Sequence, residues 1–213
     1  MNRKGYSAVT AAFLTLEFLL YAAFLSLDLI GRGGQTIWLK YSGILLCLLY
    51  ALLCALRGGD WLVFPALLFT AGADWFLLVQ NDRLELGLVL FLVVQTLYLI
   101  RLRRMGSGSG HWLRCTLALL LGIIVFVCSL ASVLNLLVAL YFSQLLANTI
   151  LAWSAKKWIF ALGLTLFVCC DICVGLFNLG ILYPFASVGM WLFYLPSQML
   201  IVLSAKEAHY EAK

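Results

Sequence analysis

The chain has 213 residues, of which 65% are hydrophobic and 11% are charged, and its mean hydropathy is +1.07. A soluble domain of this size would leave too much apolar surface in water, so the composition excludes that class and predicts a polytopic membrane protein. The net charge of +5 comes from basic residues scattered over short loops, which argues against a nucleic-acid partner.

Eight apolar runs, each close to the length that crosses a bilayer, follow one another along the chain. They predict an all-α fold, in which residues 1–213 form a single domain, a bundle of eight transmembrane helices. We place the helices at Ser7–Ile30, Ile37–Leu56, Trp61–Gln80, Leu84–Ile100, Trp112–Leu130, Ser132–Trp153, Trp158–Leu179 and Pro184–Ser204. The weakest boundary lies near Ala131, and the Gly-Ser run within residues 101–111 predicts a flexible loop.

The distribution of basic residues predicts the orientation of the bundle. With eight spans, 11 of the 14 lysines and arginines fall on the side that carries both termini, and only Arg32, Lys40 and Arg83 fall on the other. The positive-inside rule therefore places both termini and the loop at 101–111 in the cytoplasm. The short termini and compact chain fit a bacterial cytoplasmic membrane, and the sequence leaves the oligomeric state open.

Two aspartates interrupt predicted spans. Asp74 lies 13 residues after Trp61 in the third helix, and Asp171 lies 13 residues after Trp158 in the seventh. A charged carboxylate in hydrocarbon costs at least about 2.5–3.5 kcal/mol, so such residues usually face a polar site inside the bundle. Asn81 and Asn178 each follow seven residues later, on the same helical face, which hints at a duplicated four-helix unit.

Other predicted helices offer polar side chains at helical spacing, which would line a common polar pocket. They are Glu17 and Tyr21, Gln95 and Tyr98, the set Tyr141, Gln144 and Asn148, and the pair Tyr194 and Gln198. A purely structural interpretation stays open for the amides, Glu17 and the aspartates, in which they only bond neighbouring helices. The two histidines, His111 and His209, fall in predicted cytoplasmic segments, so no metal or organic cofactor is expected.

Four segments, in register along most of the chain, carry a family resemblance. Residues 72–78, Gly-Ala-Asp-Trp-Phe-Leu-Leu, are similar to a G-D-x-L-L element, and residues 91–98 are similar to F-L-x-x-H-x-x-Y. Gly163–Phe167 with Asp171 follow a G-x-x-x-F…S-D element, and residues 194–201 follow Y-x-x-x-Q-x-L-I. Together they resemble the YhhN family of lysoplasmalogenase-like membrane proteins. Lys40 falls where that family carries Lys-Pro.

The sequence departs from the family pattern at three positions. Gln95 stands where the family usually has histidine, Ala73 replaces a glycine, and Tyr41 replaces the proline. The resemblance implies hydrolysis of the vinyl ether bond of a lysoplasmalogen, a lysophospholipid-type substrate, within the lipid bilayer. Because Gln95 does not titrate, retention of that reaction rests on the carboxylates.

The residues allow a mechanism of this kind. One of Asp74 and Asp171, protonated, would give a proton to the β-carbon of the vinyl ether, and the other, ionised, would stabilise the cation and guide water. Which aspartate takes which role is left open. The substrate-binding residues would be Lys40, which could hold the phosphate, together with Asn81, Gln95, Tyr98, Tyr141, Tyr194 and Gln198.

Two other functions fit the same residues. A small proton-coupled transporter or lipid translocator would use the carboxylates as a relay, and a structural scaffold would use them only to join helices. A transporter needs a route to both faces of the membrane. The sequence places most polar groups in the outer half of the spans, which favours an enclosed enzyme pocket.

Overall fold

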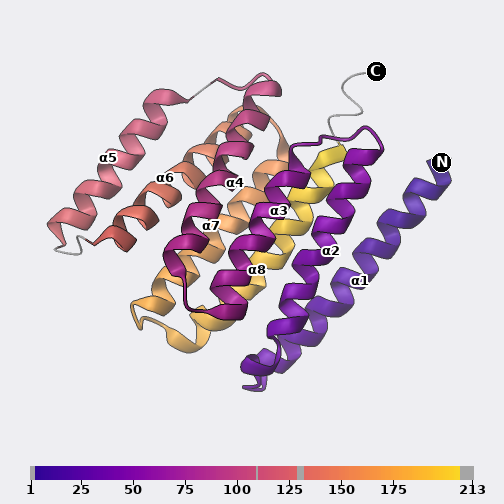
Figure 1. Ribbon diagram of the computed structural model, residues 1–213, viewed down its shortest axis with the longest axis horizontal. Coiled ribbons are helices and arrows are strands. Elements are labelled where there is room, and N and C mark those ends of the chain that lie inside the picture. The colour runs from indigo at the N-terminus through magenta and orange to yellow at the C-terminus, as the bar shows by residue number, and fades with distance from the viewer. Residues whose placement is uncertain (1–2, 109, 129–131, 207–213) are drawn as a thin grey trace.

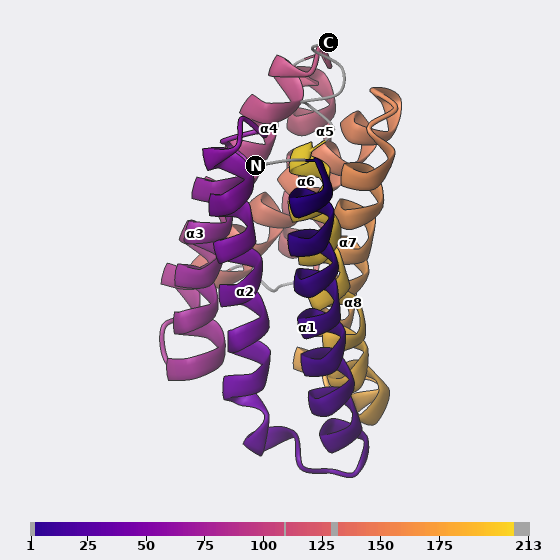
Figure 2. The same ribbon diagram turned by 90° about the vertical axis from the view of Figure 1, so that its right-hand side faces the viewer.

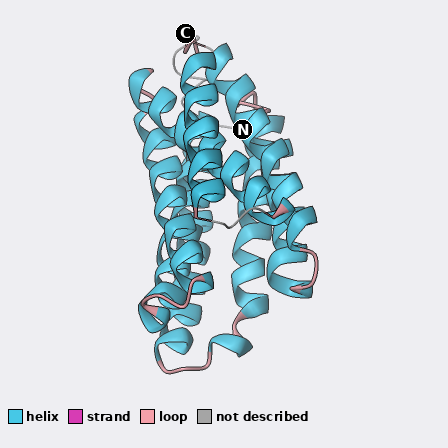
Figure 3. Cartoon of the chain, turned by 90° about the vertical axis from the view of Figure 1, so that its left-hand side faces the viewer, coloured by secondary structure: helices cyan, strands magenta, loops and turns pink. Residues whose placement is uncertain are grey.

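The computed structural model describes residues 3–108, 110–128 and 132–206, and within these ranges all regular structure is helical (Figure 3). The α-helices are α1 (Arg3–Leu29), α2 (Ile37–Leu56), α3 (Val63–Asp74), α4 (Leu84–Arg104), α5 (His111–Val127), α6 (Val133–Ser154), α7 (Trp158–Asn178) and α8 (Tyr183–Leu203). Short helical turns are η1 (Gly33–Gln35), the π-helical η2 (Trp75–Gln80) and η3 (Ser204–Lys206).

The helices form a closed circuit, in which each packs against the next. Helices α1, α2, α3, α4, α6, α7 and α8 contact one another in this order, and α8 returns to α1. A further contact between α2 and α8 separates a triangle of α1, α2 and α8 from a larger ring, formed by α2, α3, α4, α6, α7 and α8. Helix α5 packs on α6 at the edge of the bundle (Figure 1).

The helices run side by side between two opposite ends of the bundle. Helix α1 begins and α8 ends at the same end, which we call the terminal end (Figures 1 and 2). The links α1–α2, α3–α4 and α7–α8 lie at the opposite end (Figure 1). Seven helical stretches of the described chain are long and apolar enough to cross a membrane, so this is an integral membrane protein.

The predicted all-helical fold is confirmed, and most helix boundaries agree within a few residues. Helix α5, with 17 residues, falls short of the length of the seven candidate spans. The loop expected at 101–111 is shorter than predicted, because α4 continues to Arg104 and buries Arg101. Residue 109 of that loop and residues 129–131, where the weakest boundary was expected, lie outside the described residues.

The end of the third span differs from a regular α-helix. Helix α3 ends at Asp74 and continues as the π-helical turn η2, whose wider turns shift side chains away from α-helical register. Asn81 then closes the turn with a φ of 53°, and its N–H donates to Phe76 O at 2.9 Å. Asparagine adopts this left-handed conformation more readily than most residues. The expectation that Asn81 shares a face with Asp74 is therefore wrong, since Asn81 is an exposed end residue.

A glycine sets the spacing of α7 and α8. A Cβ added to Gly163 would lie 2.9 Å from Ile201 Cγ1 and 3.1 Å from Ser197 O. Small residues at such positions let two helix backbones approach closely, a common way of packing helices in membranes. The close approach holds the first half of α7 against the last turns of α8, which follow Tyr194.

Candidate functional site

The two intramembrane aspartates face the interior of the six-helix ring, and each is held by a tyrosine from another helix. Tyr194 Oη of α8 donates to Asp74 Oδ2 of α3 at 2.6 Å. Tyr141 Oη of α6 donates to Asp171 Oδ2 of α7 at 2.7 Å. Asp74 is 5% exposed, whereas Asp171 is only half-buried. Four helices, α3, α6, α7 and α8, thus contribute one carboxylate or one hydroxyl each.

The two pairs form one cluster. Asp171 interacts electrostatically with Asp74, and Cys170 interacts with both carboxylates. Phe91 and Phe167 pack against each other with ring centroids 5.7 Å apart, and each also packs on one of the two tyrosines at 5.6 Å. The tyrosines that hold the carboxylates are therefore packed among aromatic rings, whose low polarity strengthens electrostatic interactions at the site.

The predicted residues of α4, α6 and α8 extend this cluster toward the terminal end. Asn148 Nδ2 donates to Gln95 Oε1 at 2.8 Å and to Gln95 O at 2.9 Å. Tyr98 and Gln198 are fully buried; the Tyr98 hydroxyl faces the Thr70 hydroxyl, and Gln198 Oε1 has no hydrogen-bond partner among the described residues. An unpartnered buried polar atom is costly, so Gln198 Oε1 is available to a bound molecule or water.

Not every predicted residue joins the cluster. Asn81 is exposed at the end of η2, and Asn178 is exposed and donates only to Val174 O within its own helix. Glu17 lies in the triangle of α1, α2 and α8, where Cys47 Sγ donates to its Oε1 at 3.2 Å. Cys47 thus holds one Glu17 oxygen from the neighbouring helix, and Glu17 Oε2 has no hydrogen-bond partner among the described residues.

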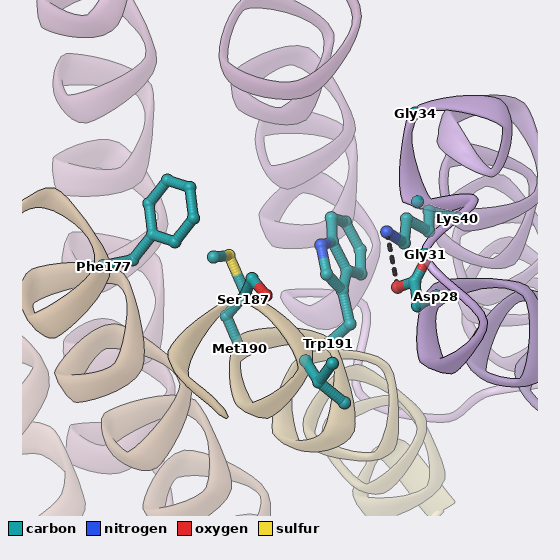
Figure 4. Close-up of a pocket in the computed structure, with 10 residues that line it drawn as sticks. Asp28, Gly31, Gly34, Lys40, Phe177, Ser187, Met190 and Trp191 are labelled. Atoms are coloured by element: carbon teal, nitrogen blue, oxygen red, sulfur yellow. Dashed lines mark ion pairs between the residues drawn. The ribbon is translucent and has the colours of Figure 1, made fainter. Parts of the chain in front are cut away.

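Lys40 lies at the opposite end, in the wall of a cavity of about 400 Å³ (Figure 4). Its Nζ forms an ion pair with Asp28 Oδ2 at 2.7 Å and lies 4.7 Å from the centroid of the Trp191 ring. Neither aspartate of the central cluster lines this cavity. Trp191 connects the two regions, because its ring packs edge-on against Tyr194 at 5.6 Å.

One comparison with known proteins gave a match. The model of the YhhN family matches residues 35–205, which include both aspartates and both tyrosines. The chain belongs to the YhhN family. No curated protein and no solved structure gave a match. The predicted family is thus confirmed over most of the chain.

Several polar residues of this YhhN protein were not singled out as site residues from the sequence. Asp28 and Trp191 line the cavity beside Lys40, and Cys170 is buried in α7 next in sequence to Asp171. Thr70, one helical turn before Asp74, is fully buried, and its hydroxyl faces that of Tyr98. Its spacing from Asp74 is the one sequence signal that could have indicated it.

The terminal end of this YhhN protein also contains buried charge. Arg101 is fully buried and its Nε donates to Asp60 Oδ2 at 2.6 Å, while its two other nitrogens donate to Ser204 at 2.8 and 2.9 Å. Arg114 donates to Gln144 at 2.6 Å and to Asn148 at 2.5 Å. The expectation of few polar groups in this half is therefore wrong, because isolated charged residues in the sequence meet only after the helices pack.

The central cluster provides groups for acid–base chemistry. It holds two carboxylates, two tyrosine hydroxyls and a thiol, all of which can exchange protons. Among the described residues, no group of three or more His, Cys, Asp and Glu side chains is placed to hold a metal ion. Two carboxylates in one site, one protonated and one ionised, are the arrangement that general acid–base catalysis uses.

Proposed function

We propose that this protein hydrolyses the vinyl ether bond of lysoplasmalogens, or of a related ether lysolipid, and releases a fatty aldehyde. The observation that carries the proposal is the pair of carboxylates inside the six-helix ring, each held by its own tyrosine. Membership of the YhhN family is consistent with a membrane hydrolase of this kind. The apolar surroundings of the pair suit a substrate whose reacting bond begins a hydrocarbon chain.

Burial supports an assignment of the two roles. A charge costs more where burial is more complete, so Asp74, at 5% exposure, is assigned as the protonated acid. Both carboxylates accept one tyrosine hydroxyl on Oδ2, so burial alone separates them. Asp171, which is more exposed than Asp74, is assigned as the ionised group.

The reaction balances with water as the only co-substrate. Asp74 transfers its proton to the β-carbon of the vinyl ether, which makes the neighbouring carbon an oxocarbenium ion. Asp171 stabilises this cation and takes a proton from the attacking water, which forms a hemiacetal. The hemiacetal breaks into an aldehyde and a glycerol hydroxyl, and proton transfer within the pair restores Asp74.

The direct test is aldehyde release from an alkenyl lysophospholipid by purified protein in detergent. We expect Asp74→Asn and Asp171→Asn each to lower kcat by at least about 100-fold, because general acid–base catalysis typically contributes 10²–10⁴-fold. Asp82→Asn provides the matched control, since Asp82 is exposed in the link between η2 and α4. Full activity in both central variants would refute the mechanism.

A second function is favoured by one specific observation. Buried polar groups continue from the carboxylates to the terminal end through Gln95, Tyr98 and Arg101, as a proton-coupled transporter would require. In that case the purified protein would release no aldehyde in detergent. Reconstituted vesicles would instead show substrate uptake that depends on a pH gradient and is lost in Asp74→Asn.

A further inference from the structure

We propose that the cavity at the opposite end binds a zwitterionic phosphate-ester headgroup, with Lys40 on the phosphate and Asp28 on the ammonium. This rests on the proposed function for its substrate, a lysolipid, and adds a specificity residue that sequence reasoning did not single out. The cavity of about 400 Å³ lies between the α1–α2 link and the ends of α7 and α8, with Phe177, Ser187 and Met190 among its walls (Figure 4).

Both charges of the pair are withdrawn from solvent. The side chains of Lys40 and Asp28 are each 6% exposed, and their atoms are 2.7 Å apart. Removing two charges from water is costly, and such a pair often contributes little to stability. A buried pair in the wall of a cavity therefore indicates recognition, and its two signs match a ligand that carries both charges.

The surroundings fix each partner separately. Thr36 Oγ1 lies 2.8 Å from Asp28 Oδ1 and 2.7 Å from Gly33 O, so its one hydrogen is shared between them and the carboxylate keeps further lone pairs. The Lys40 ammonium lies 4.7 Å from the centroid of the Trp191 ring, within the range of a cation–π contact. A phosphate can therefore approach Lys40, and an ammonium can approach Asp28, without either side chain leaving its place.

Glycines keep the Asp28 side of the cavity open. A Cβ on Gly33 would lie 3.3 Å from Asp28 Oδ1, tighter than ordinary contact. Gly31 has a φ of 79°, which a residue with a side chain rarely adopts, and it lets the chain turn sharply after α1. Close to Gly31 and Gly34 there is free space, where a headgroup could enter beside the carboxylate.

The cavity is placed to serve the central carboxylates. Trp191 contacts Lys40 on one side and Tyr194 on the other, and Tyr194 donates to Asp74. These residues are less than one helical turn apart on α8, so a headgroup in the cavity directs its chain toward Asp74. The cavity lies at the helix ends, where lipid headgroups meet a bilayer-spanning protein.

The test measures binding without catalysis. Saturated 1-alkyl lysophospholipids lack the vinyl ether, so their binding to the purified protein in detergent is independent of hydrolysis. We expect the ethanolamine lipid to bind at least about tenfold more tightly than the anionic glycerol lipid, since one charged hydrogen bond contributes roughly that factor. Equal binding of the two lipids would overturn the inference, even if aldehyde release were confirmed.

Variants of Lys40 and Asp28 test which side chain binds the phosphate and which binds the ammonium of the headgroup. Asp28→Asn should reduce the preference to about twofold or less by weakening ethanolamine binding, and Lys40→Gln should weaken both lipids at least about tenfold. The double variant Asp28→Asn with Lys40→Gln leaves no unpaired charge, so it is expected to fold and to bind both lipids weakly. Tight ethanolamine binding by the folded double variant would refute the site, and Asp82→Asn should bind like wild type.

A soluble competitor distinguishes a lipid headgroup from a free phosphate ester. Glycerophosphoethanolamine carries the same charges without a chain, so it should compete at least about 100-fold more weakly than the lipid, because it buries no hydrocarbon. Competition as strong as that of the lipid would show that the cavity serves a soluble ester, and would overturn the lipid assignment.

Discussion

The hydroxyl groups of Tyr141 and Tyr194 make equivalent hydrogen bonds, but they act on carboxylates in different surroundings. Tyr141 donates to the half-buried Asp171, and Tyr194 donates to the nearly inaccessible Asp74. A hydrogen bond to a charged group contributes about 1.5–3 kcal/mol, against about 0.5–1.5 kcal/mol for a neutral one. The two tyrosines should therefore differ in importance if one carboxylate is ionised and the other is not.

Substitution with phenylalanine exposes this difference, since it removes only the hydroxyl. If Asp171 is the ionised partner, Tyr141→Phe should lower kcat/KM for aldehyde release about 10- to 100-fold. Tyr194→Phe should lower it about tenfold or less. Thermal unfolding of both variants in detergent checks that they remain folded. The reverse order of effects would exchange the roles of Asp74 and Asp171.

At the scale of helices, Gly163 allows a close approach of α7 to α8. Gly163→Ala should destabilise the protein by about 1–3 kcal/mol, because its Cβ would press on Ile201 and on the backbone of α8. Unfolding in mixed micelles measures this change. Gly175→Ala is the matched control on the same helix, because nothing lies within 4 Å of a Cβ there. We expect it to be neutral or slightly stabilising, and equal effects would show that the close approach is unimportant.

The helices themselves could be predicted because each corresponds to its own apolar run of sufficient length in the sequence. Helix α2 begins and ends at the predicted residues, Ile37 and Leu56. The π-helical turn after Asp74 could not be predicted, because the apolar pattern continues unchanged through Trp75–Gln80. Its wider turns moved Asn81 out of the register on which its predicted role depended.

The central site could be predicted in its chemistry but not in its pairings. The aspartates were conspicuous because charge is rare in apolar spans, and Tyr141 and Tyr194 stood at helical spacing from other polar groups. That Tyr194 bonds to Asp74 and Tyr141 to Asp171 depends on which helices are neighbours in the ring. Asp28, near the end of α1, could not be predicted as a site residue, because only the fold brings Lys40 and Trp191 to the same cavity.

For the whole molecule, a buried ion pair joins elements from both halves of the sequence at the terminal end. Arg101 of α4 bonds to Asp60, which precedes α3, and to Ser204 after α8, and its guanidinium lies 4.3 Å from the centroid of the Phe160 ring of α7. The Asp60 N–H also donates to Ala205 O at 2.9 Å. The pair thus holds together four segments of the ring.

Removing either charge leaves the other buried without its main partner. Arg101→Met and Asp60→Asn should therefore each lower the free energy of unfolding by about 3–5 kcal/mol. The double variant should lose less than the sum of the two, since neither charge remains uncompensated, and a double-mutant cycle in mixed micelles measures the coupling. Arg103→Met removes an exposed arginine from the same helix and should change stability by about 0.5 kcal/mol or less. Strictly additive losses would mean that the pair does not act as a unit in joining the ring.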